Sequence, residues 1–416
     1  VVVLVIAITA IASVAYIQGS NGVEEQVKSN LQSVLVSRKA ELSSYISSIQ
    51  EDLEITAASG YTRDAITAFS DGWQKLGSPQ TELKALYLTN NFHPTGSKNK
   101  LNDAGDGSDY SAAHAKYHPW FNRMLNDRGY YDIFLFDTQG NLLYTVFKEL
   151  DYATNLLTGE YRGTDLGNAL SAGLSSPSPT FFDFKPYAPS NNAPASFMSQ
   201  QVTDETGRVI GVLAFQMPIE RIRNIMQQNA GMGETGEALL VGADQLMRSD
   251  SKFSNESTVL RTRVSDATVT AALRGQEGIE VVNDYRGNEV ISAFTSIDVL
   301  GTKWAMVAKM NRPGNEMGWT ILGVAFVFSV LMGVVGVLFA RTITKPINQM
   351  AGAMGALAGG DAEVEIPRLG AADELGAMAE SVQEFKVNLI ERRKFQEQEK
   401  KAHEIAKVNA RIKAAL

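Results

Sequence analysis

The chain contains no cysteine, and this absence excludes several kinds of chemistry at once. Without thiols the chain cannot form disulfides, a thiolate nucleophile or a thiolate metal site. Histidine is scarce as well, with 4 residues among 416. The sequence shows no Ser-His-Asp arrangement, HExxH pair or phosphate-binding P-loop. We therefore expect no catalytic residues, no metal and no cofactor, and we do not expect the chain to be an enzyme.

Basic charge is also in deficit. The 38 Lys and Arg residues are outnumbered by 46 Asp and Glu residues, which gives a net charge of -8 at pH 7. Proteins that bind nucleic acid concentrate basic side chains, often interleaved with aromatic ones, along the path of the phosphates. The sequence has no such cluster, so nucleic acid is not an expected partner. With 44% hydrophobic residues over 416 positions, the chain is expected to form several domains.

Long apolar runs are restricted to two segments. Residues 317–340 contain no charged side chain, and about 20 apolar residues are what a helix needs to cross the hydrocarbon core. We expect a transmembrane helix there. Residues 1–17 are slightly shorter, and we interpret them as a truncated first transmembrane helix. A secretory signal peptide is the alternative, because its apolar region has a similar composition.

The segment between the two apolar runs begins with helical periodicity. Apolar residues recur at spacings of three and four over residues 18–58, namely Val23, Val27, Leu31, Val34, Leu42, Tyr45, Ile49 and Leu53. This pattern predicts one long amphipathic helix. At about 1.5 Å per residue, such a helix would extend on the order of 60 Å.

Two sets of strands are expected after this helix. In the first set, strands are predicted at 131–136, 141–147, 180–187, 195–202 and 209–217, followed by a helix at 218–228. In the second set, strands are predicted at 237–241, 245–248, 279–282, 289–295 and 303–309, with a helix at 266–273. Because the same order recurs in shorter form, the sequence predicts two copies of one small antiparallel sheet.

The arrangement resembles the double Cache family, in which tandem PAS-like sensor modules follow a long N-terminal helix. The resemblance covers residues 18–312 and rests on the phrases Tyr130-Tyr131-Asp132, Lys148-Glu149-Leu150-Asp151 with Thr154-Asn155-Leu156, and Tyr187-Ala188-Pro189-Ser190. It implies an α+β membrane protein whose outer part consists of the long helix 18–58, a membrane-distal module 59–229 and a membrane-proximal module 230–312.

A sensor pocket needs a few polar groups on a concave sheet face. The first module offers the better candidates, which are His118, Trp120, Arg123, Tyr144, Lys148, Asp183, Tyr187 and Ser190. Together they could hold a zwitterion or a carboxylate, and the resemblance leaves amino acids, carboxylates and amines open as ligands. The alternative is that each of these residues belongs to the core or the surface. In the second module, Arg248, Ser249 and Asp250 form a weaker candidate set.

A heptad pattern follows the second apolar segment. Ile343, Ile347, Met350, Met354 and Leu357 lie four and three apart, and after a connector the spacing resumes with Leu375, Met378, Val382, Phe385 and Leu389. Two such helices need a partner to bury both apolar stripes, which predicts a parallel four-helix bundle in a homodimer. Pro346, Gly360-Asp361 and Asp373-Glu374-Leu375-Gly376 resemble a HAMP domain over residues 341–395. The expected relay residues are Pro346, Glu374, Ile347, Met354, Met378 and Phe385.

Taken together, these features resemble a bacterial methyl-accepting chemotaxis protein. The resemblance implies a multi-pass chemoreceptor of the inner membrane with a periplasmic sensor, which binds a small ligand and signals through HAMP to a cytoplasmic adaptor and histidine kinase. Residues 396–416 are expected to be a signalling helix that leads to a missing output region, with a PAS domain among the candidates. Alternatives with the same input are a sensor histidine kinase and a nucleotide cyclase, and a further one is an anchored binding protein without output.

Overall fold

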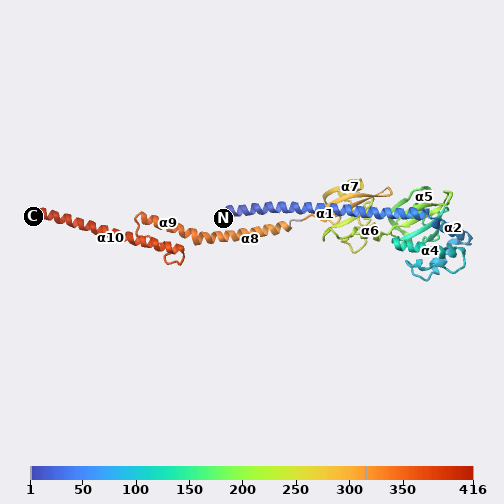
Figure 1. The fold of residues 1–416 in the computed structure, drawn as a ribbon, viewed down its shortest axis with the longest axis horizontal. Coiled ribbons are helices and arrows are strands. Elements are labelled where there is room, and N and C mark those ends of the chain that lie inside the picture. The colour runs from blue at the N-terminus through green and yellow to red at the C-terminus, as the bar shows by residue number, and fades with distance from the viewer. Residues whose placement is uncertain (1, 314–315, 416) are drawn as a thin grey trace. The chain divides into compact units, whose positions relative to one another are not determined.

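The computed structural model describes residues 2–313 and 316–415, although the side chains of residues 1–9, 12, 15–17, 20, 316–322 and 414–415 lie outside that description. The chain divides into two compact units, one formed by residues 21–314 and the other by residues 1–20 with 315–416. Each unit is described separately below, with the element labels of Figure 1.

The long N-terminal helix is α1, Val2–Ala58. Its buried side chains Leu31, Leu35, Leu42, Ile49 and Leu53 form a stripe at helical spacing, and they share one apolar core with residues of both sheets. Figure 1 shows α1 running past both sheets. Burial of each such side chain stabilises the fold by roughly 1.5–3 kcal/mol. The expected long helix is therefore confirmed, whereas the predicted first transmembrane helix at residues 1–17 falls largely on side chains outside the description.

The first module contains a five-stranded antiparallel sheet with the order β2-β1-β5-β4-β3. Its strands are β1 Asp132–Asp137, β2 Leu142–Thr145, β3 Thr180–Tyr187, β4 Ala193–Thr203 and β5 Val209–Gln216. The helices around it are α2 Gly60–Lys75, α3 Pro79–Lys84, α4 Asp109–Arg128, α5 Asp165–Ser175 and α6 Ile219–Met226. Short helical turns lie at Ala85–Thr89, Lys98–Lys100 and Ala188–Ser190.

The two faces of this sheet bury different sets of residues. On one face, Ile133, Leu135, Leu213 and Phe215 pack with α1, α2 and α4 in the main core. On the other face, Phe134, Phe136, Phe197, Val212 and Ala214 pack beneath α5. Alternate residues of a strand point to opposite faces, so the burial of both sets explains why β1 is apolar throughout its centre.

The second module repeats this plan in shorter form. Its antiparallel sheet has the order β6-β9-β8-β7, with β6 Glu237–Val241, β7 Gly278–Asn283, β8 Glu289–Val299 and β9 Thr302–Asn311. Helix α7, Ala267–Leu273, covers one face. Asp266 caps α7 by accepting hydrogen bonds from the backbone N–H groups of Thr268 and Val269, each at 3.1 Å, as a residue at an N-cap does.

The strand predicted at residues 245–248 is wrong. This segment forms only isolated bridges, Val241 to Met247 and Leu246 to Arg263. The reason is a tight turn, in which the Gly242 N–H donates to the Leu246 carbonyl at 2.9 Å and Gln245 adopts a positive φ of 65°. The chain therefore reverses before a ladder can extend.

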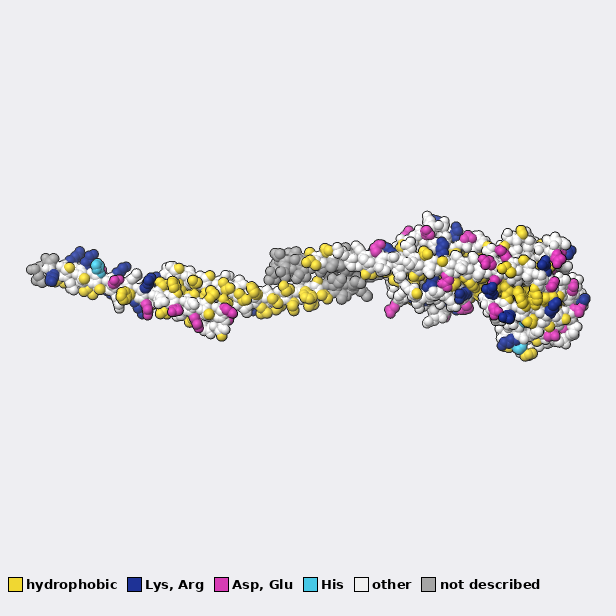
Figure 2. All heavy atoms as spheres, viewed as in Figure 1, with side chains coloured by type: hydrophobic (Ala, Val, Ile, Leu, Met, Phe, Trp, Pro, Cys, Tyr) yellow, Lys and Arg dark blue, Asp and Glu magenta, His cyan; other side chains and the backbone are white. Residues whose placement is uncertain are grey.

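The other unit contains the second apolar segment. Helix α8, Glu316–Phe339, continues through a π-helical turn at Ala340–Thr344 into α9, Lys345–Ala358. Within the described residues, one helix, Gly323–Ala358, is long and apolar enough to cross a membrane, and its side chains are not buried inside the protein. Figure 2 shows hydrophobic side chains gathered along α8. This location agrees with the transmembrane helix predicted at 317–340.

Helices α9 and α10, Glu374–Ala415, pack against each other through a small apolar cluster. The cluster consists of Met350, Ala353, Leu357, Ile366, Ala379 and Val382. Of the expected relay residues, Pro346 is buried and Glu374 is the exposed first residue of α10. Ile347, Met354, Met378 and Phe385 are 43–57% exposed in the single chain. The predicted homodimeric bundle, in which these four residues would face a second copy, stays a prediction.

Candidate functional site

Helix α4 directs His118 into the interior of the first module. The His118 side chain is 2% exposed, its Nδ1 lies 2.7 Å from the Tyr144 hydroxyl, and its Nε2 lies 2.6 Å from the Asn99 carbonyl. Its ring stacks on that of His114 with centroids 4.4 Å apart. Burial, with a smaller contribution from the Lys148 charge, lowers the pKa of His118 to about 3. His118 and Tyr144, both predicted to bind ligand, thus belong to a neutral, internally hydrogen-bonded network.

Lys148 is fully buried at the end of the first hairpin. Its ammonium donates hydrogen bonds to the carbonyls of Thr145 and Val146, each at 3.0 Å, and lies 5.1 Å from the Tyr144 ring centroid. Burial lowers the pKa of Lys148 to about 7, against the attraction of Asp132. Lys148 forms no ion pair among the described residues, so it is available to respond to charge nearby.

Two of the predicted residues lie on the surface instead. Trp120 is 39% exposed and packs against Tyr61, with ring centroids 5.1 Å apart. The Arg123 side chain is 83% exposed and pairs with Asp127 one helical turn later at 3.2 Å. The structure therefore does not bring Trp120 and Arg123 together with the other candidates.

Asp183 connects the two modules. Its carboxylate accepts hydrogen bonds from Arg248 Nε at 3.0 and 3.1 Å, from Arg248 Nη2 at 2.9 Å and from Trp304 Nε1 at 3.0 Å. Arg248 and Trp304 belong to the second module and are both buried. Asp183 also accepts from the Phe184 N–H of its own strand at 2.7 Å, and its other partners lie at this contact, so it forms a structural link between the sheets.

Tyr187 and Ser190 converge with residues that sequence reasoning did not single out. The Tyr187 hydroxyl donates to Asp151 Oδ2 at 2.5 Å, and the Ser190 hydroxyl donates to Glu149 Oε2. The Tyr131 hydroxyl donates to the other Glu149 oxygen at 3.0 Å. Glu149 and Asp151 come one and three positions after Lys148. The segment after the first hairpin therefore places two carboxyl groups beside the end of β3.

Asp132, the first residue of β1, supplies a third carboxyl group. Its side chain is 1% exposed and accepts hydrogen bonds from the N–H groups of Ile133 at 2.7 Å and Val146 at 2.9 Å, and from the Thr145 hydroxyl. Burial raises the pKa of Asp132, and the nearby Glu149 and Asp151 carboxylates raise it further. We call Asp132, Glu149 and Asp151, with the hydroxyl groups that contact them and Gln216 beside Asp132 in the sheet, the acidic cluster.

The acidic cluster is buried but not internally satisfied. Asp151 Oδ1 and Gln216 Oε1 have no hydrogen-bond partner, although the two residues are 1% and 2% exposed. Gln216 lies directly opposite Asp132 in the register of β1 and β5. Buried polar atoms are rarely left unpaired, and those that are deserve an explanation such as a bound group. Both unpaired atoms are oxygens that accept hydrogen bonds, so the cluster is complementary to a hydrogen-bond donor.

The negative charge of the cluster is only partly compensated, because Lys148 attracts Asp132 and Lys84 attracts Asp151 without forming an ion pair with either. Burial raises the pKa of Asp132 and of Asp151 to about 7, and it also raises the pKa of Glu149. None of these three carboxylates forms an ion pair with a basic side chain among the described residues. A positive charge placed among them would favour the ionised carboxylates and be stabilised by them.

The sequence contained a signal for this cluster. Asp132, Glu149 and Asp151 all lie within the phrases on which the family resemblance rested, together with Lys148, Tyr187 and Ser190. Those phrases are separated by up to 55 positions, and nothing in their spacing shows that their side chains meet. The tertiary fold brings them together at one end of the first sheet.

The weaker candidates of the second module have structural partners. Arg248 binds Asp183 as described, Ser249 Oγ accepts a hydrogen bond from the Leu240 N–H at 2.9 Å, and Asp250 pairs with Arg223 at 2.7 Å. These contacts account for all three residues without a ligand. Within the described residues, no group of three or more acidic or histidine side chains has a metal-binding arrangement.

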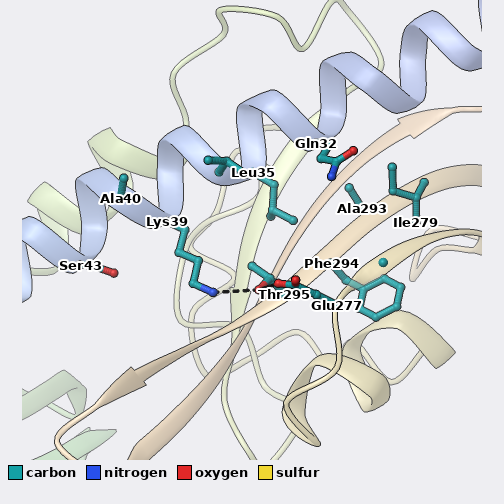
Figure 3. A pocket seen from close by; sticks show the side chains of 12 residues that line it. Gln32, Leu35, Lys39, Ala40, Ser43, Glu277, Ile279, Ala293, Phe294 and Thr295 are labelled. Atoms are coloured by element: carbon teal, nitrogen blue, oxygen red, sulfur yellow. Dashed lines mark hydrogen bonds between the residues drawn. The ribbon is translucent and has the colours of Figure 1, made fainter.

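A groove of about 610 Å³ lies between α1 and strands β7 and β8 of the second module. Figure 3 shows that its charged residues reach toward the same hydroxyl group, because Lys39 donates to Thr295 Oγ1 at 3.0 Å and Thr295 donates to Glu277 at 3.3 Å. The groove is partly open to solvent and offers few polar contacts beyond this set. It therefore lacks the unpaired buried atoms that mark the acidic cluster.

Comparison with known protein families locates two domains. Residues 19–313 match the Cache domain, and residues 338–391 match the HAMP domain. Among curated proteins, the chain is 24% identical over 314 residues to "Probable chemoreceptor y4sI" of Sinorhizobium fredii. The match covers 73% of this chain and 39% of the relative, so the chain spans about two fifths of that protein's length.

Solved structures give more distant similarities. The sensor domain of the Vibrio cholerae histidine kinase DctB is 10% identical with a TM-score of 0.43, covering 69% of this chain and 98% of that one. The ligand-binding domain of the Campylobacter jejuni chemoreceptor Tlp3, in complex with 4-methylisoleucine, is 13% identical with a TM-score of 0.39, covering 69% and 92%. The ligand-binding domain of the Pseudomonas aeruginosa amino acid chemoreceptor PctC, in complex with GABA, is 17% identical with a TM-score of 0.35, covering 64% and 99%.

Proposed function

Since this chain belongs to the Cache domain family, we propose that it is the sensor and relay part of a transmembrane chemoreceptor, and that it binds a small ligand bearing an ammonium group in its first module. The proposal is supported by the Cache and HAMP matches and by the similarity to a chemoreceptor. The location of the site and the class of ligand are argued from the acidic cluster.

One observation carries the choice of ligand. The cluster buries three carboxyl groups, and two of its oxygen atoms, Asp151 Oδ1 and Gln216 Oε1, have no donor. An ammonium group supplies up to three N–H donors and a positive charge. Hydrogen bonds between such a donor and a carboxylate are roughly twice as strong as neutral ones. A ligand with only carboxylate groups would meet like charges, so amines and amino acids are favoured over simple organic acids.

Access requires movement of the segment that follows the first hairpin. Asp132, Asp151 and Tyr187 are at most 2% exposed, whereas Leu150, between Glu149 and Asp151, is 56% exposed. This segment contains two residues with positive φ, Lys148 at 55° and Ala153 at 57°, a region that non-glycine residues seldom adopt. We infer that residues 148–153 open to admit the ligand and close over it.

We propose that the signal passes from the sensor to α8 because α8 follows the second module directly in the chain. A ligand shifts an equilibrium between two packings only by the difference in its affinity for them, typically 1–3 kcal/mol. In this proposal the shift changes the position of α8 and, through it, the packing of α9 against α10 in a dimeric HAMP bundle. The sensor lies outside the cell, and the HAMP helices lie in the cytoplasm.

The output partner is proposed from the similarity to a chemoreceptor. We propose a cytoplasmic adaptor and histidine kinase as partners because the Sinorhizobium fredii relative is named a probable chemoreceptor. A sensor histidine kinase is the second candidate, since an input of this type also occurs with a kinase. Co-purification of the complete gene product with an adaptor and kinase would separate the two, because a sensor kinase carries its own ATP-binding domain.

A thermal-shift screen tests the ligand proposal. The chain in nanodiscs is heated with primary amines, amino acids or dicarboxylates, and bound ligand raises the unfolding temperature by mass action. We expect a saturable rise with amines or amino acids. In Asp151→Asn the affinity should fall roughly tenfold or more, whereas Asp127→Asn, which removes the same charge from an exposed position, should bind normally. A rise with dicarboxylates alone, or equal affinity in both variants, would contradict the proposal.

A further inference from the structure

Four strands of the first sheet correspond to the four strands of the second, and β2, at the edge of the first sheet, has no counterpart. The corresponding strands lie in the order β1-β5-β4-β3 in the first sheet and β6-β9-β8-β7 in the second. In both sheets the first strand of the module therefore pairs with its last strand. The helix that directly precedes β3 in the first module, α5, and the helix that directly precedes β7 in the second, α7, cover equivalent faces. Residues at the same register can therefore be compared directly.

The comparison singles out one pair of positions. Asp132 opens β1 and faces Gln216 of β5, and Glu237 opens β6 and faces Lys309 of β9. Thr145 donates to Asp132, and Ser251 donates in the same way to Glu237 at 2.8 Å. Both modules thus place a buried, hydroxyl-bonded carboxyl group at the same corner of the sheet. They differ in the residue opposite, which is a neutral amide in the first module and an ammonium group in the second.

The Lys309 side chain is completely buried at this corner. Its exposed fraction is 0%, and its ammonium forms an ion pair with Asp266, the residue that caps α7. Burial raises the pKa of Asp266, but the Lys309 charge and the hydrogen bonds from Thr268 and Val269 outweigh it, so the pKa lies below its ordinary value. The Lys309 charge also acts on Glu237, whose pKa burial raises. The ammonium therefore has two acidic neighbours, on β6 and at the start of α7.

We propose that the Lys309 ammonium is a built-in substitute for a ligand: it fills in the second module the position that an external ammonium group takes in the first, so the second module is closed to ligand unless Lys309 is shortened. The inference rests on the proposed function only for the comparison with the first module. The prediction that shortening Lys309 opens an ammonium site depends on the second module alone.

The proposal explains why the two copies have different roles. The buried ion pair between Lys309 of β9 and Asp266 at the start of α7 keeps the second sheet and α7 joined, because separating them would leave uncompensated charges in the interior. The second module then serves as a rigid connection between the first module and α8. The first module, which has Gln216 at this register, keeps two unpaired acceptors that a ligand can fill, Asp151 Oδ1 and Gln216 Oε1. In the second module one oxygen, Glu237 Oε1, also lacks a hydrogen bond, and it lies 4.0 Å from the Arg286 guanidinium.

Chemical rescue tests the proposal on the chain in nanodiscs. Lys309→Ala removes three methylene groups and the ammonium, which together correspond to n-propylammonium. The unfolding temperature is measured by tryptophan fluorescence in n-propylammonium chloride and, as a neutral control, in n-propanol. Without additive, the variant should unfold roughly 5 °C or more below wild type. Lys303→Ala, which removes an exposed lysine from the same strand, is the matched control.

In the supporting outcome, propylammonium at about tenfold its dissociation constant raises the unfolding temperature of Lys309→Ala by roughly 3 °C or more beyond any rise in wild type and in Lys303→Ala. If Lys309→Ala does not fold, the same comparison is made with Lys309→Gln, which copies the residue of the first module. Equal unfolding temperatures in propylammonium and in propanol would overturn the inference. If the ligand proposal for the first module is wrong, the unfolding temperature of wild type will not respond to amines, whereas that of the Lys309 variant still will.

Discussion

At the scale of single residues, burial and charge oppose each other in the acidic cluster. Asp132 and Asp151 have pKa values raised to about 7 by burial, and Lys148 has a pKa lowered to about 7 by the same cause. Each shift reflects the free energy required to hold a charge away from water. Near neutral pH, a small change in pH therefore alters the charge that a ligand would meet.

We predict that the affinity for an ammonium ligand rises with pH between 6 and 8. Asp132 and Asp151 lose protons over this range and gain attraction for a cation, while Lys148 loses its charge and no longer repels it. The ligand itself stays protonated, since alkylammonium groups titrate near 10. The gain should be roughly tenfold if one proton is released on binding. Isothermal titration calorimetry in buffers of different ionisation enthalpy measures both the affinity and the proton release.

The result of that titration also identifies the sign of the ligand's charge. An anionic ligand would bind more weakly as the pH rises, because it would meet more carboxylate and less ammonium. An affinity that falls between pH 6 and 8 would therefore contradict the cationic ligand. In Asp132→Asn, which cannot ionise at this position, the dependence on pH should be shallower than in wild type.

Asp132 should also affect stability in a way that depends on pH. Its pKa in the folded protein, about 7, lies above the value of about 3.9 for an unfolded Asp, so the folded state binds the extra proton between these values. The stability that this proton provides is present at low pH and is lost as the pH rises through 7. We predict that Asp132→Asn gains stability relative to wild type by roughly 1 kcal/mol per pH unit between pH 5 and 7.

Urea unfolding of wild type and Asp132→Asn at pH 5 and pH 7 measures this difference. The amide keeps the same size, and its oxygen can still accept from the N–H groups of Ile133 and Val146. The Thr145 hydroxyl can accept from the amide nitrogen in place of donating. A difference between the two proteins that is the same at both pH values would show that Asp132 titrates normally.

The fold separates the residues that the sequence predicts as ligand-binding into different places. Lys148, Tyr187 and Ser190 were named as candidates and lie at or beside the acidic cluster. Trp120 and Arg123 do not reach the acidic cluster because they lie on the outer side of α4. His118, Phe121 and Leu125 of α4 are buried, and positions 120 and 123 fall on the other side of a helix with 3.6 residues per turn.

At the scale of elements, the contact between the two sheets depends on one carboxylate. Asp183 of β3 accepts four hydrogen bonds from Arg248 and Trp304, and the rings of Phe181 and Phe184 lie 5.8 and 6.1 Å from that of Trp304. Arg248 is 4% exposed, and its Nη1 group also pairs with Asp244 at 3.0 Å. Removal of Asp183 would leave the Nε and Nη2 groups of this buried side chain without their acceptor.

We predict that Asp183→Ala destabilises the sensor by about 3–5 kcal/mol, the range for breaking a buried ion pair. Trp304→Phe keeps the ring but loses one hydrogen bond to a charged acceptor, and it should cost about 1.5–3 kcal/mol. Lys185→Ala is the matched control on the same strand, because its side chain is 68% exposed and pairs with Asp165. An exposed pair contributes about 0–1 kcal/mol. Equal losses for Asp183→Ala and Lys185→Ala in urea unfolding would refute the link.

Most element positions followed from pattern alone. The long helix, the α7 helix and the strands of both sheets were predicted from periodicity, and β3 and β6 were predicted at their observed bounds. The strand expected at 245–248 was wrong because the backbone turns at Gln245, which adopts a positive φ. A positive φ at a residue other than glycine has no composition signal.

At the scale of the whole molecule, the HAMP helices bury one set of apolar residues and leave another set exposed. Met350, Leu357 and Val382 pack within one chain, whereas Ile347 and Met354 remain exposed. Both groups belong to the same heptad pattern. A second copy of the chain would bury the exposed set, as expected for a four-helix bundle.

We predict that single cysteines at Ile347 or Met354 form disulfide-linked dimers in membranes under mild oxidation. The native chain has no cysteine, so each variant contains one reactive thiol. Asn348→Cys is the matched control, because this exposed residue lies on the same helix but away from the heptad positions. Non-reducing gel electrophoresis gives the dimer fraction. Equal cross-linking at positions 347, 348 and 354 would argue against the parallel dimer.

The sequence by itself determined the features that depend on local periodicity and composition: the apolar helix that can cross a membrane, the long amphipathic helix, the alternating strands and the heptad pattern. These are properties of near neighbours along the chain, and hydrophobic burial acts on them directly. Only the tertiary structure decided which polar residues meet. Asp132, Asp151 and Gln216 are far apart in sequence, as are Glu237, Asp266 and Lys309, and their contacts arise from strand register and from helices packed across sheet faces, which no local pattern specifies.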